Sequence, residues 1–175
     1  MQENFEINAV SRDVQGKVPS RRLRREGLVP GIIYGGSAEP QMFSTKHNEL
    51  LQHLEHEAFY SHILTVKVDG QAQKVVLKDL QRHPAKPFVM HLDLLRVSES
   101  DRIKMHVPLH FINEDTCPGA KAGGKVSHVM TDVEVICAAK DLPEYIAVDL
   151  ANMNVGDTLH LTELQLPEGV EVLAL

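Results

Sequence analysis

The side chains best suited to bind a ligand are the cations of one short segment near the N-terminus. The segment carries Lys17, Arg21, Arg22, Arg24 and Arg25, with no acid among them. Arginine binds phosphate through a planar fork of N–H groups, so arginine in place of lysine favours phosphate as the ligand. The whole chain has a formal net charge of −6, so the cluster is not part of a general cationic excess. We therefore expect a nucleic acid as the partner. The alternative is a basic helix face that meets only solvent.

The cluster is predicted to lie on a helix of about two turns. Pro19 and Ser20 are typical of a helix start, with Ser20 as the N-cap. Gly27 is typical of the residue that ends a helix. Arg21 and Arg22 would then lie in the first turn, where the helix dipole favours acids over cations. A bound anion would remove this conflict.

Ten histidines raise two other possibilities, a metal site and an enzyme active site. His53 and His56 have the i, i+3 spacing of zinc ligands, but no cysteine or third spaced ligand is near them in the sequence. His83, His91 and Asp93 are suited to acid–base chemistry, yet no nucleophile elbow, P-loop or Rossmann glycine pattern accompanies them. We therefore expect no metal, no cofactor, no small-molecule substrate and no catalysis. A small cytosolic hydrolase with a His/Asp site is the alternative.

Length and composition are those of an ordinary globular protein. The chain has 175 residues, of which 43% are hydrophobic and 24% charged, enough for one large domain or two small ones. No apolar run approaches the roughly 18 residues of a membrane helix, and the first residues lack the cationic start of a secretory signal. Cys117 and Cys137 have no CxxC spacing, which is typical of free thiols in a reducing compartment. These features predict a cytoplasmic protein with no membrane partner.

Charge is distributed unequally along the chain. Residues 1–97 hold 13 Lys and Arg against 11 Asp and Glu, a net charge of +2, and residues 98–175 hold 5 against 13, a net charge of −8. Residues 98–101 form a short polar joint between these halves. We therefore predict two domains, 1–97 and 98–175, with different roles. The acidic half is a poor surface for a nucleic acid because it repels phosphate.

Alternation of apolar and polar residues predicts the elements of the first half. The expected strands are 5–10, 28–34, 41–44, 61–68, 71–80 and 89–97. A helix is expected between the third and fourth strands, capped by Thr45 and ending near Glu57. Asp69 and Gly70 are typical of a two-residue hairpin turn, and residues 81–87 are expected to form a polar loop. These elements predict a small mixed sheet or a partly closed barrel.

The second half is predicted to be almost entirely β. Strands are expected at 103–112, 126–137, 145–150 and 170–173, with one turn of helix near 161–164 and a glycine-rich loop at 113–125. The fold class predicted for the whole chain is therefore mainly β with a few short helices. It consists of an N-terminal small β-barrel with flanking helices plus a second β-rich domain.

Four ordered segments of the first half carry a resemblance to a known family. They are SRRLRREG at 20–27, PGIIYGG at 30–36, FYSHILTVKVDG at 59–70 and QRHPAKPFVMHLDLLRV at 81–97. In these segments the chain resembles the L-twenty-five family of bacterial large-subunit ribosomal proteins, which includes the general stress protein Ctc. The resemblance covers roughly residues 3–97. Longer members of that family carry a second, acidic β-rich domain, and residues 98–175 look like it.

The resemblance implies a structural, non-enzymatic constituent of the large ribosomal subunit that supports translation in the cytoplasm. It implies 5S ribosomal RNA (rRNA) as the ligand, bound by a basic helix and a barrel surface, with neighbouring large-subunit proteins as further partners. The family's RNA contacts fall here on Arg12, Lys17, Ser20, Arg21, Arg24, Tyr34, Gln81, Arg82, His91 and Asp93. One departure is Ala85, where some relatives carry an aromatic residue.

His91 and Asp93 are two residues apart on a predicted strand and therefore share one side of it. We expect this pair to face the RNA and to read bases. A carboxylate beside a polyanion is repelled unless it accepts hydrogen bonds from base amino or imino groups. The alternative is that Asp93 pairs with Arg82 or Arg24 and only orients the arginine.

Overall fold

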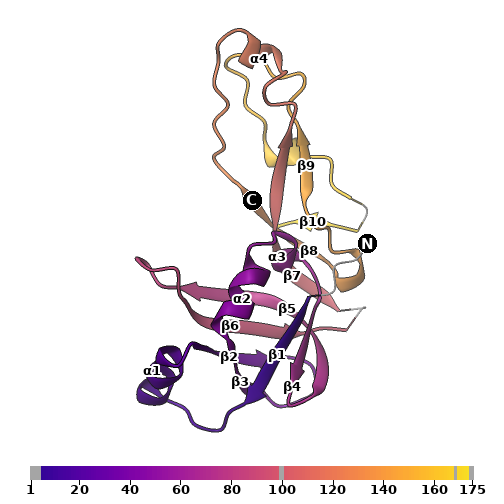
Figure 1. The fold of residues 1–175 in the computed structure, drawn as a ribbon. Coiled ribbons are helices and arrows are strands. Elements are labelled where there is room, and N and C mark those ends of the chain that lie inside the picture. The colour runs from indigo at the N-terminus through magenta and orange to yellow at the C-terminus, as the bar shows by residue number, and fades with distance from the viewer. Residues whose placement is uncertain (1–4, 99–100, 168, 174–175) are drawn as a thin grey trace. The chain divides into compact units, whose positions relative to one another are not determined.

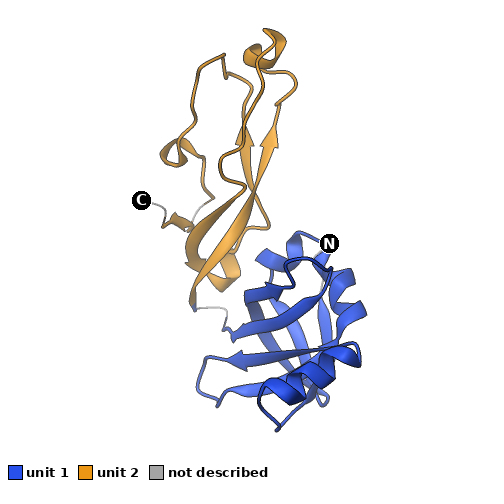
Figure 2. Ribbon diagram, turned by 90° about the vertical axis from the view of Figure 1, so that its left-hand side faces the viewer, with its two compact units in different colours: residues 1–101 blue, residues 102–175 orange. Residues whose placement is uncertain are grey.

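The computed structural model describes residues 5–98, 101–167 and 169–173. The chain forms two compact units that divide between Asp101 and Arg102 (Figure 2). None of the helices in the described ranges is long and apolar enough to cross a membrane. The division falls at the end of the polar segment 98–101.

Unit 1 is a closed barrel of six strands, which confirms the predicted barrel (Figure 1). The strand order around the barrel is β1-β3-β2-β6-β5-β4. The pairs β1–β4 and β2–β6 are parallel and the others antiparallel. The elements of the unit are β1 (Glu6–Ser11), α1 (Lys17–Arg25), β2 (Leu28–Tyr34), β3 (Gln41–Lys46), α2 (His47–Leu54), α3 (Ala58–Ser61), β4 (Leu64–Val68), β5 (Gln71–Arg82) and β6 (Val89–Arg96).

The barrel interior is filled by the apolar residues of the alternating strands. Ile33, Phe43, Leu92 and Leu94 are all completely buried. Gly31 lies among them on β2, and a Cβ added there would lie against the Phe43 ring and 2.8 Å from the Leu92 carbonyl oxygen. A glycine is therefore needed at this position for β2 and β6 to pair while the phenylalanine ring fills the barrel.

Helix α1 begins earlier than predicted, and Ser20 is not its N-cap. The helix starts at Lys17 with Gly16 as the cap, and the Ser20 N–H donates to the Gly16 carbonyl oxygen at 3.2 Å. Pro19 lies in the first turn, where its missing N–H leaves no bond unmade. Gly27 follows the helix with a φ of 76°, as the predicted end requires.

The earlier start changes the electrostatics of α1. Arg22, Arg24 and Arg25 lie in its last turn, where the helix dipole favours cations. The predicted conflict between arginines and the dipole is therefore wrong. The case for a bound anion has to come from the arginine side chains themselves.

The predicted helix after β3 is two helices, and Thr45 does not cap it. Thr45 is a buried residue of β3, and its hydroxyl donates to the Asn8 carbonyl oxygen of β1 at 2.8 Å. Helix α2 begins at His47 instead, whose N–H donates to the Gly27 carbonyl oxygen at 2.9 Å. The local sequence suggested that the Thr45 side chain caps a helix, but this side chain instead joins β3 to β1 in the closed barrel.

The hairpin between β4 and β5 is confirmed, but β5 runs further than predicted. Asp69 and Gly70 both have positive φ angles, 49° and 86°, as a tight two-residue turn requires. Gln81 and Arg82, predicted to lie in a loop, are strand residues paired with β6. The pairing of β5 with β6 shifts its register between Leu77 and Asp79, and this shift changes which side of the barrel wall the later residues of β5 face.

Unit 2 contains one sheet of four strands in the order β10-β8-β7-β9. Its long central strand buries Ile103, Met105, Val107 and Leu109 in alternation, as predicted. The strand expected at 126–137 begins only at residue 132. The elements are β7 (Arg102–Ile112), α4 (Pro118–Lys121), β8 (Asp132–Ala138), η1 (Ala139–Asp141), β9 (Ile146–Asp149), η2 (Leu161–Glu163) and β10 (Glu171–Val172), where η marks a 3₁₀ turn.

Candidate nucleic-acid interface

Three adjoining strands of the barrel, β2, β6 and β5, carry the polar residues predicted to read RNA. His91 lies on β6 directly opposite Gln81 of β5, and Asp93 follows it on the same side. Leu92 between them is completely buried, so the polar pair faces outward. Tyr34 ends the neighbouring strand β2 and is half-buried. We call this outer side of β2, β6 and β5 the polar face.

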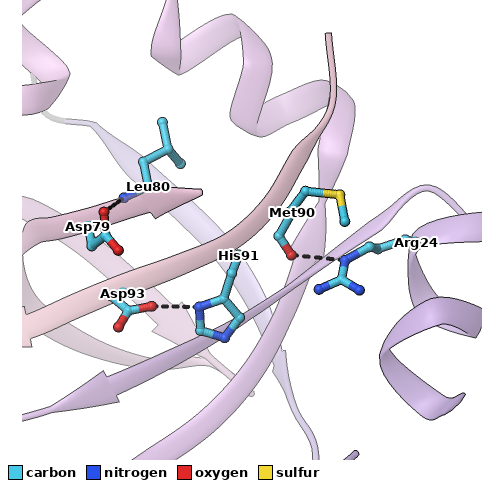
Figure 3. A network of polar contacts seen from close by, with 6 residues as sticks. All are labelled: Arg24, Asp79, Leu80, Met90, His91 and Asp93. Atoms are coloured by element: carbon cyan, nitrogen blue, oxygen red, sulfur yellow. Dashed lines mark hydrogen bonds and ion pairs between the residues drawn. The ribbon is translucent and has the colours of Figure 1, made fainter. Parts of the chain in front are cut away.

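His91 and Asp93 form a closely coupled pair at the centre of the polar face (Figure 3). His91 Nδ1 lies 2.5 Å from Asp93 Oδ1, and the two side chains are 23% and 26% exposed. A carboxylate oxygen accepts, so Nδ1–H is the donor and the imidazole ring is held in one orientation. The ring therefore presents Nε2, and the carboxylate its second oxygen, to a partner.

Neither Arg24 nor Arg82, the two arginines predicted as alternative partners of Asp93, is paired with it. Arg24 Nε donates to the Met90 carbonyl oxygen at 2.9 Å (Figure 3). Arg82 Nη2 donates to the Tyr60 hydroxyl at 2.6 Å. The carboxylate orients a histidine rather than an arginine. This bond directs the Arg82 side chain toward α3.

A second carboxylate lies beside the pair, and sequence reasoning missed it. Asp79 is paired directly opposite Asp93 in the β5–β6 ladder, and its Oδ1 accepts the Leu80 N–H at 2.8 Å (Figure 3). Like charges directly opposite each other destabilise a sheet. Asp79 occupies this position because the register shift after Leu77 changes which residues of β5 face β6, and no simple alternation predicts such a shift.

These carboxylates raise the pKa of Tyr34 above its ordinary value of 10.0. Burial is the larger cause, and Asp93 and Asp79 add to it because they oppose the phenolate charge. The neutral phenol therefore contributes stability that is present below its unfolded pKa and is lost as the pH rises through the folded value. The window lies above about pH 10.

We expect Asp93→Asn to lower the Tyr34 pKa without restoring its ordinary value, because burial remains the larger cause. Phenolate absorbance during an alkaline titration measures it. The chain has three tyrosines, so Tyr34→Phe identifies the Tyr34 contribution. A Tyr34 titration that Asp93→Asn leaves unchanged would contradict the arrangement of the polar face.

The predicted residues of α1 occupy one face of that helix. Lys17, Ser20, Arg21 and Arg24 have the spacing i, i+3, i+4 and i+7, which gathers them on a single side. The bond from Arg24 to the backbone of β6 places this side next to the polar face. Lys17 and Arg21 are exposed and Arg24 is half-buried. We call these four residues the α1 cationic face.

Arg12, just beyond β1, has an unusual environment. Its Nε and Nη1 atoms are buried, and neither has a hydrogen-bond partner among the described residues. Burial and, second, the charge of Arg24 lower the pKa of the Arg12 guanidinium. Two arginines are thus close enough to repel each other, and one is partly removed from water without a partner. The family resemblance placed Arg12 among the predicted RNA contacts, but the sequence did not predict the burial of its side-chain nitrogens.

Comparison with known proteins finds a ribosomal-protein family model that matches each unit. Residues 7–94 match the family model "Ribosomal L25p family", and residues 102–175 match "Ribosomal protein TL5, C-terminal domain". Each of the relatives below is named large ribosomal subunit protein bL25. The chain is 56% identical to that of Hahella chejuensis over 174 residues, which cover 98% of this chain and 84% of the relative.

Two further relatives are similarly close. The Methylococcus capsulatus protein is 54% identical over 172 residues, covering 98% of this chain and 85% of the relative. The Saccharophagus degradans protein is 55% identical over 175 residues, covering 99% and 83%. The matches extend over both compact units. The chain therefore belongs to the ribosomal L25p family, with a C-terminal domain of the TL5 type after its barrel.

Proposed function

We propose that this protein is a structural constituent of the large ribosomal subunit and binds 5S rRNA through the α1 cationic face and the polar face. Family membership and the names of the relatives support a place in the large subunit. The ten residues predicted to contact RNA are the proposed interface. Binding is the proposed activity, without catalysis, and the ribosome in the cytoplasm is the proposed location.

The observation that carries the RNA proposal is the pair of buried guanidinium nitrogens of Arg12, Nε and Nη1, which have no hydrogen-bond partner among the described residues and lie near the charge of Arg24. A buried charge without a partner is unfavourable, and a second cation nearby makes it more so. A phosphate removes both penalties at once because it supplies acceptor oxygens and opposite charge. The free protein thus holds two arginines in an arrangement that an anion stabilises.

The polar face supplies what phosphate contacts alone lack, a means to distinguish bases. The His91–Asp93 pair presents a fixed ring nitrogen and a free carboxylate oxygen. A carboxylate accepts from base amino and imino groups but is repelled by phosphate. Cations at the margin and a carboxylate at the centre therefore suit a ligand with phosphates at its edges and bases between them.

The hydrolase alternative has less support. Among the residues that the structure describes, the His91 side chain has Asp93 as its hydrogen-bond partner, and no serine, threonine or cysteine is bonded to its ring. A His/Asp pair without a nucleophile lacks the first component of a covalent hydrolase. The relatives bear the name of a ribosomal protein.

We assign different roles to the proposed domains, 1–97 and 98–175. The second domain is acidic, and its cysteines at 117 and 137 are free and buried. Burial raises the pKa of the Cys137 thiol and so disfavours its nucleophilic thiolate. The charge of the second domain disfavours RNA, and we assign this domain to contacts with neighbouring large-subunit proteins. The first domain carries the RNA contacts.

Replacing Arg12 with methionine tests the observation on which the RNA proposal rests. The change keeps the buried stem and removes the charge, so we expect the free protein to be as stable as the wild type or more stable. Binding of 5S rRNA should weaken, and the log–log slope of affinity against salt should fall by about one unit. Urea unfolding and filter binding at several salt concentrations measure the two effects.

Arg102→Met is the matched control, because Arg102 is an exposed arginine of unit 2 that pairs with Glu171. It should leave the salt slope unchanged. A wild-type slope in Arg12→Met, or a decrease in slope that is equal in both variants, would show that Arg12 is not a phosphate ligand.

A further inference from the structure

We propose that Phe88 is a stacking platform for an unpaired nucleobase of the bound RNA. The inference rests on the proposed function but concerns a residue outside the predicted contact set. It commits to a base as the ligand of the ring, with phosphates of the same strand held by the α1 cationic face.

Phe88 exposes its ring at a position where the backbone is anchored. The side chain is 49% exposed, whereas its neighbour Val89 is 2% exposed and belongs to the barrel core. Val89 begins β6, so the backbone that carries the ring is fixed by the barrel. The ring faces outward at the end of the loop 83–88.

Hydrogen bonds and a ring contact hold Phe88 in place. Its N–H donates to the Lys86 carbonyl oxygen at 2.7 Å, and its own carbonyl oxygen accepts the His83 N–H at 2.8 Å. Its ring centroid lies 5.2 Å from that of His47, tilted by 57°. His47 is buried, and its Nε2 accepts the Val89 N–H at 3.1 Å. A pre-placed ring loses little conformational freedom when a base stacks on it.

The ring is also connected to the α1 cationic face. Arg24 binds the carbonyl oxygen of Met90, two residues after Phe88. The carbonyl oxygen of Gly27, just after α1, accepts the N–H of His47, whose ring Phe88 packs on. Phe88 thus lies where the end of α1, the start of α2 and the start of β6 are joined. Single-stranded RNA binds surfaces that combine exposed rings for its bases with cations for its phosphates, and here Phe88 and the α1 cationic face supply the two.

A second exposed aromatic residue, Tyr145, shows what distinguishes Phe88. The two are similarly exposed, Phe88 at 49% and Tyr145 at 47%. Tyr145 lies in the acidic unit 2, and one side of its ring is stacked on His110 at 4.4 Å and 10°. A lone exposed apolar side chain needs no explanation. The link to the α1 cationic face through Arg24 and the fixed backbone of Phe88 are what point to a base.

Four substitutions in the full chain test the proposal with a 5S rRNA transcript as the ligand. Phe88→Ala should weaken binding about 5- to 100-fold while leaving the salt slope unchanged. Phe88→Leu, which keeps an apolar side chain without a ring, should weaken binding nearly as much. Phe88→Tyr, which keeps the ring, should retain affinity. Tyr145→Ala is the control and should bind like the wild type.

A spectroscopic measurement makes the test independent of the measured affinity. The chain contains no tryptophan, so Phe88→Trp introduces a single tryptophan, whose emission can be excited selectively over that of the three tyrosines. RNA should quench its emission and protect it from acrylamide, because a stacked base covers one side of the indole. Val129→Trp places the reporter at a 93% exposed position of unit 2 and should not respond.

Wild-type affinity in Phe88→Ala, full affinity in Phe88→Leu, or unchanged emission of Phe88→Trp at saturating RNA would each overturn the stacking proposal alone. A wild-type chain that does not bind 5S rRNA would overturn both this proposal and the proposed function. The wild-type titration therefore separates the two failures.

Discussion

Replacing both Arg21 and Arg24 with alanine is expected to lower the salt slope of 5S rRNA binding by about two units, one for each phosphate that the protein no longer neutralises. The two arginines share the α1 cationic face, and Arg24 is held against β6 by its bond to the Met90 carbonyl oxygen. Affinity should fall about tenfold or more for each arginine, because each substitution removes a charge-assisted hydrogen bond to the RNA. Filter binding at four or more salt concentrations gives both quantities.

The matched control removes the same charge from the same helix. Arg22 and Arg25 are exposed residues of α1 outside its cationic face. Arg22→Ala with Arg25→Ala should change the slope much less, because these side chains make no proposed phosphate contact. Equal effects of the two double substitutions would mean that only the total charge of α1 matters. The assignment of the phosphate contacts to the α1 cationic face would then be wrong.

Asp93→Asn is expected to weaken 5S rRNA binding by about 1–3 kcal/mol with an unchanged salt slope. The amide keeps the shape of the carboxylate but is a weaker acceptor for the 2.5 Å hydrogen bond that orients His91 and for donors on the bases. Both effects concern base contacts, which release no counterions. Titrations at several salt concentrations separate affinity from slope. Unchanged or tighter binding, the result of merely removing a negative charge near RNA, would contradict base reading.

Asp79→Asn is the control for charge in the same place. Asp79 lies opposite Asp93 on β5, and its carboxylate is bonded to the backbone N–H of Leu80 rather than to His91. Removing its charge relieves repulsion from Asp93 and from phosphate. We therefore expect binding at least as tight as that of the wild type. A decrease in affinity as large as that of Asp93→Asn would assign base reading to both carboxylates.

Strands of the barrel were predictable because burial on one side imposes alternation. The strand at 28–34 was predicted with its observed bounds, and the Asp69-Gly70 turn was predicted from local chemistry alone. Local signals failed where tertiary contacts use the same side chain. Thr45 resembles a helix cap, but its hydroxyl joins β3 to β1. Ser20 likewise lies inside α1, because Gly16 and Lys17 begin the helix one turn earlier.

The residues of the candidate site could be named from the sequence, but their arrangement in space could not be predicted from it. The resemblance supplied the ten residues, and helix and strand periodicity placed most of them on two adjoining surfaces. Three features needed the structure. Asp79 lies opposite Asp93 because of a register shift. Two guanidinium nitrogens of Arg12 are buried without a partner among the described residues. Phe88 packs on His47, which lies far from it in the sequence. Each depends on contacts between distant segments that no local pattern records.

The salt dependence of 5S rRNA binding by the intact chain tests the central claim most directly. Affinity is measured by filter binding across a range of monovalent salt, with an RNA of the same length and unrelated sequence as the competitor. Binding through about five phosphates predicts a log–log slope of about −3.5 to −4.5, and base contacts predict that 5S rRNA is preferred over the competitor. A slope near zero, or equal binding of both RNAs, would contradict the proposed interface.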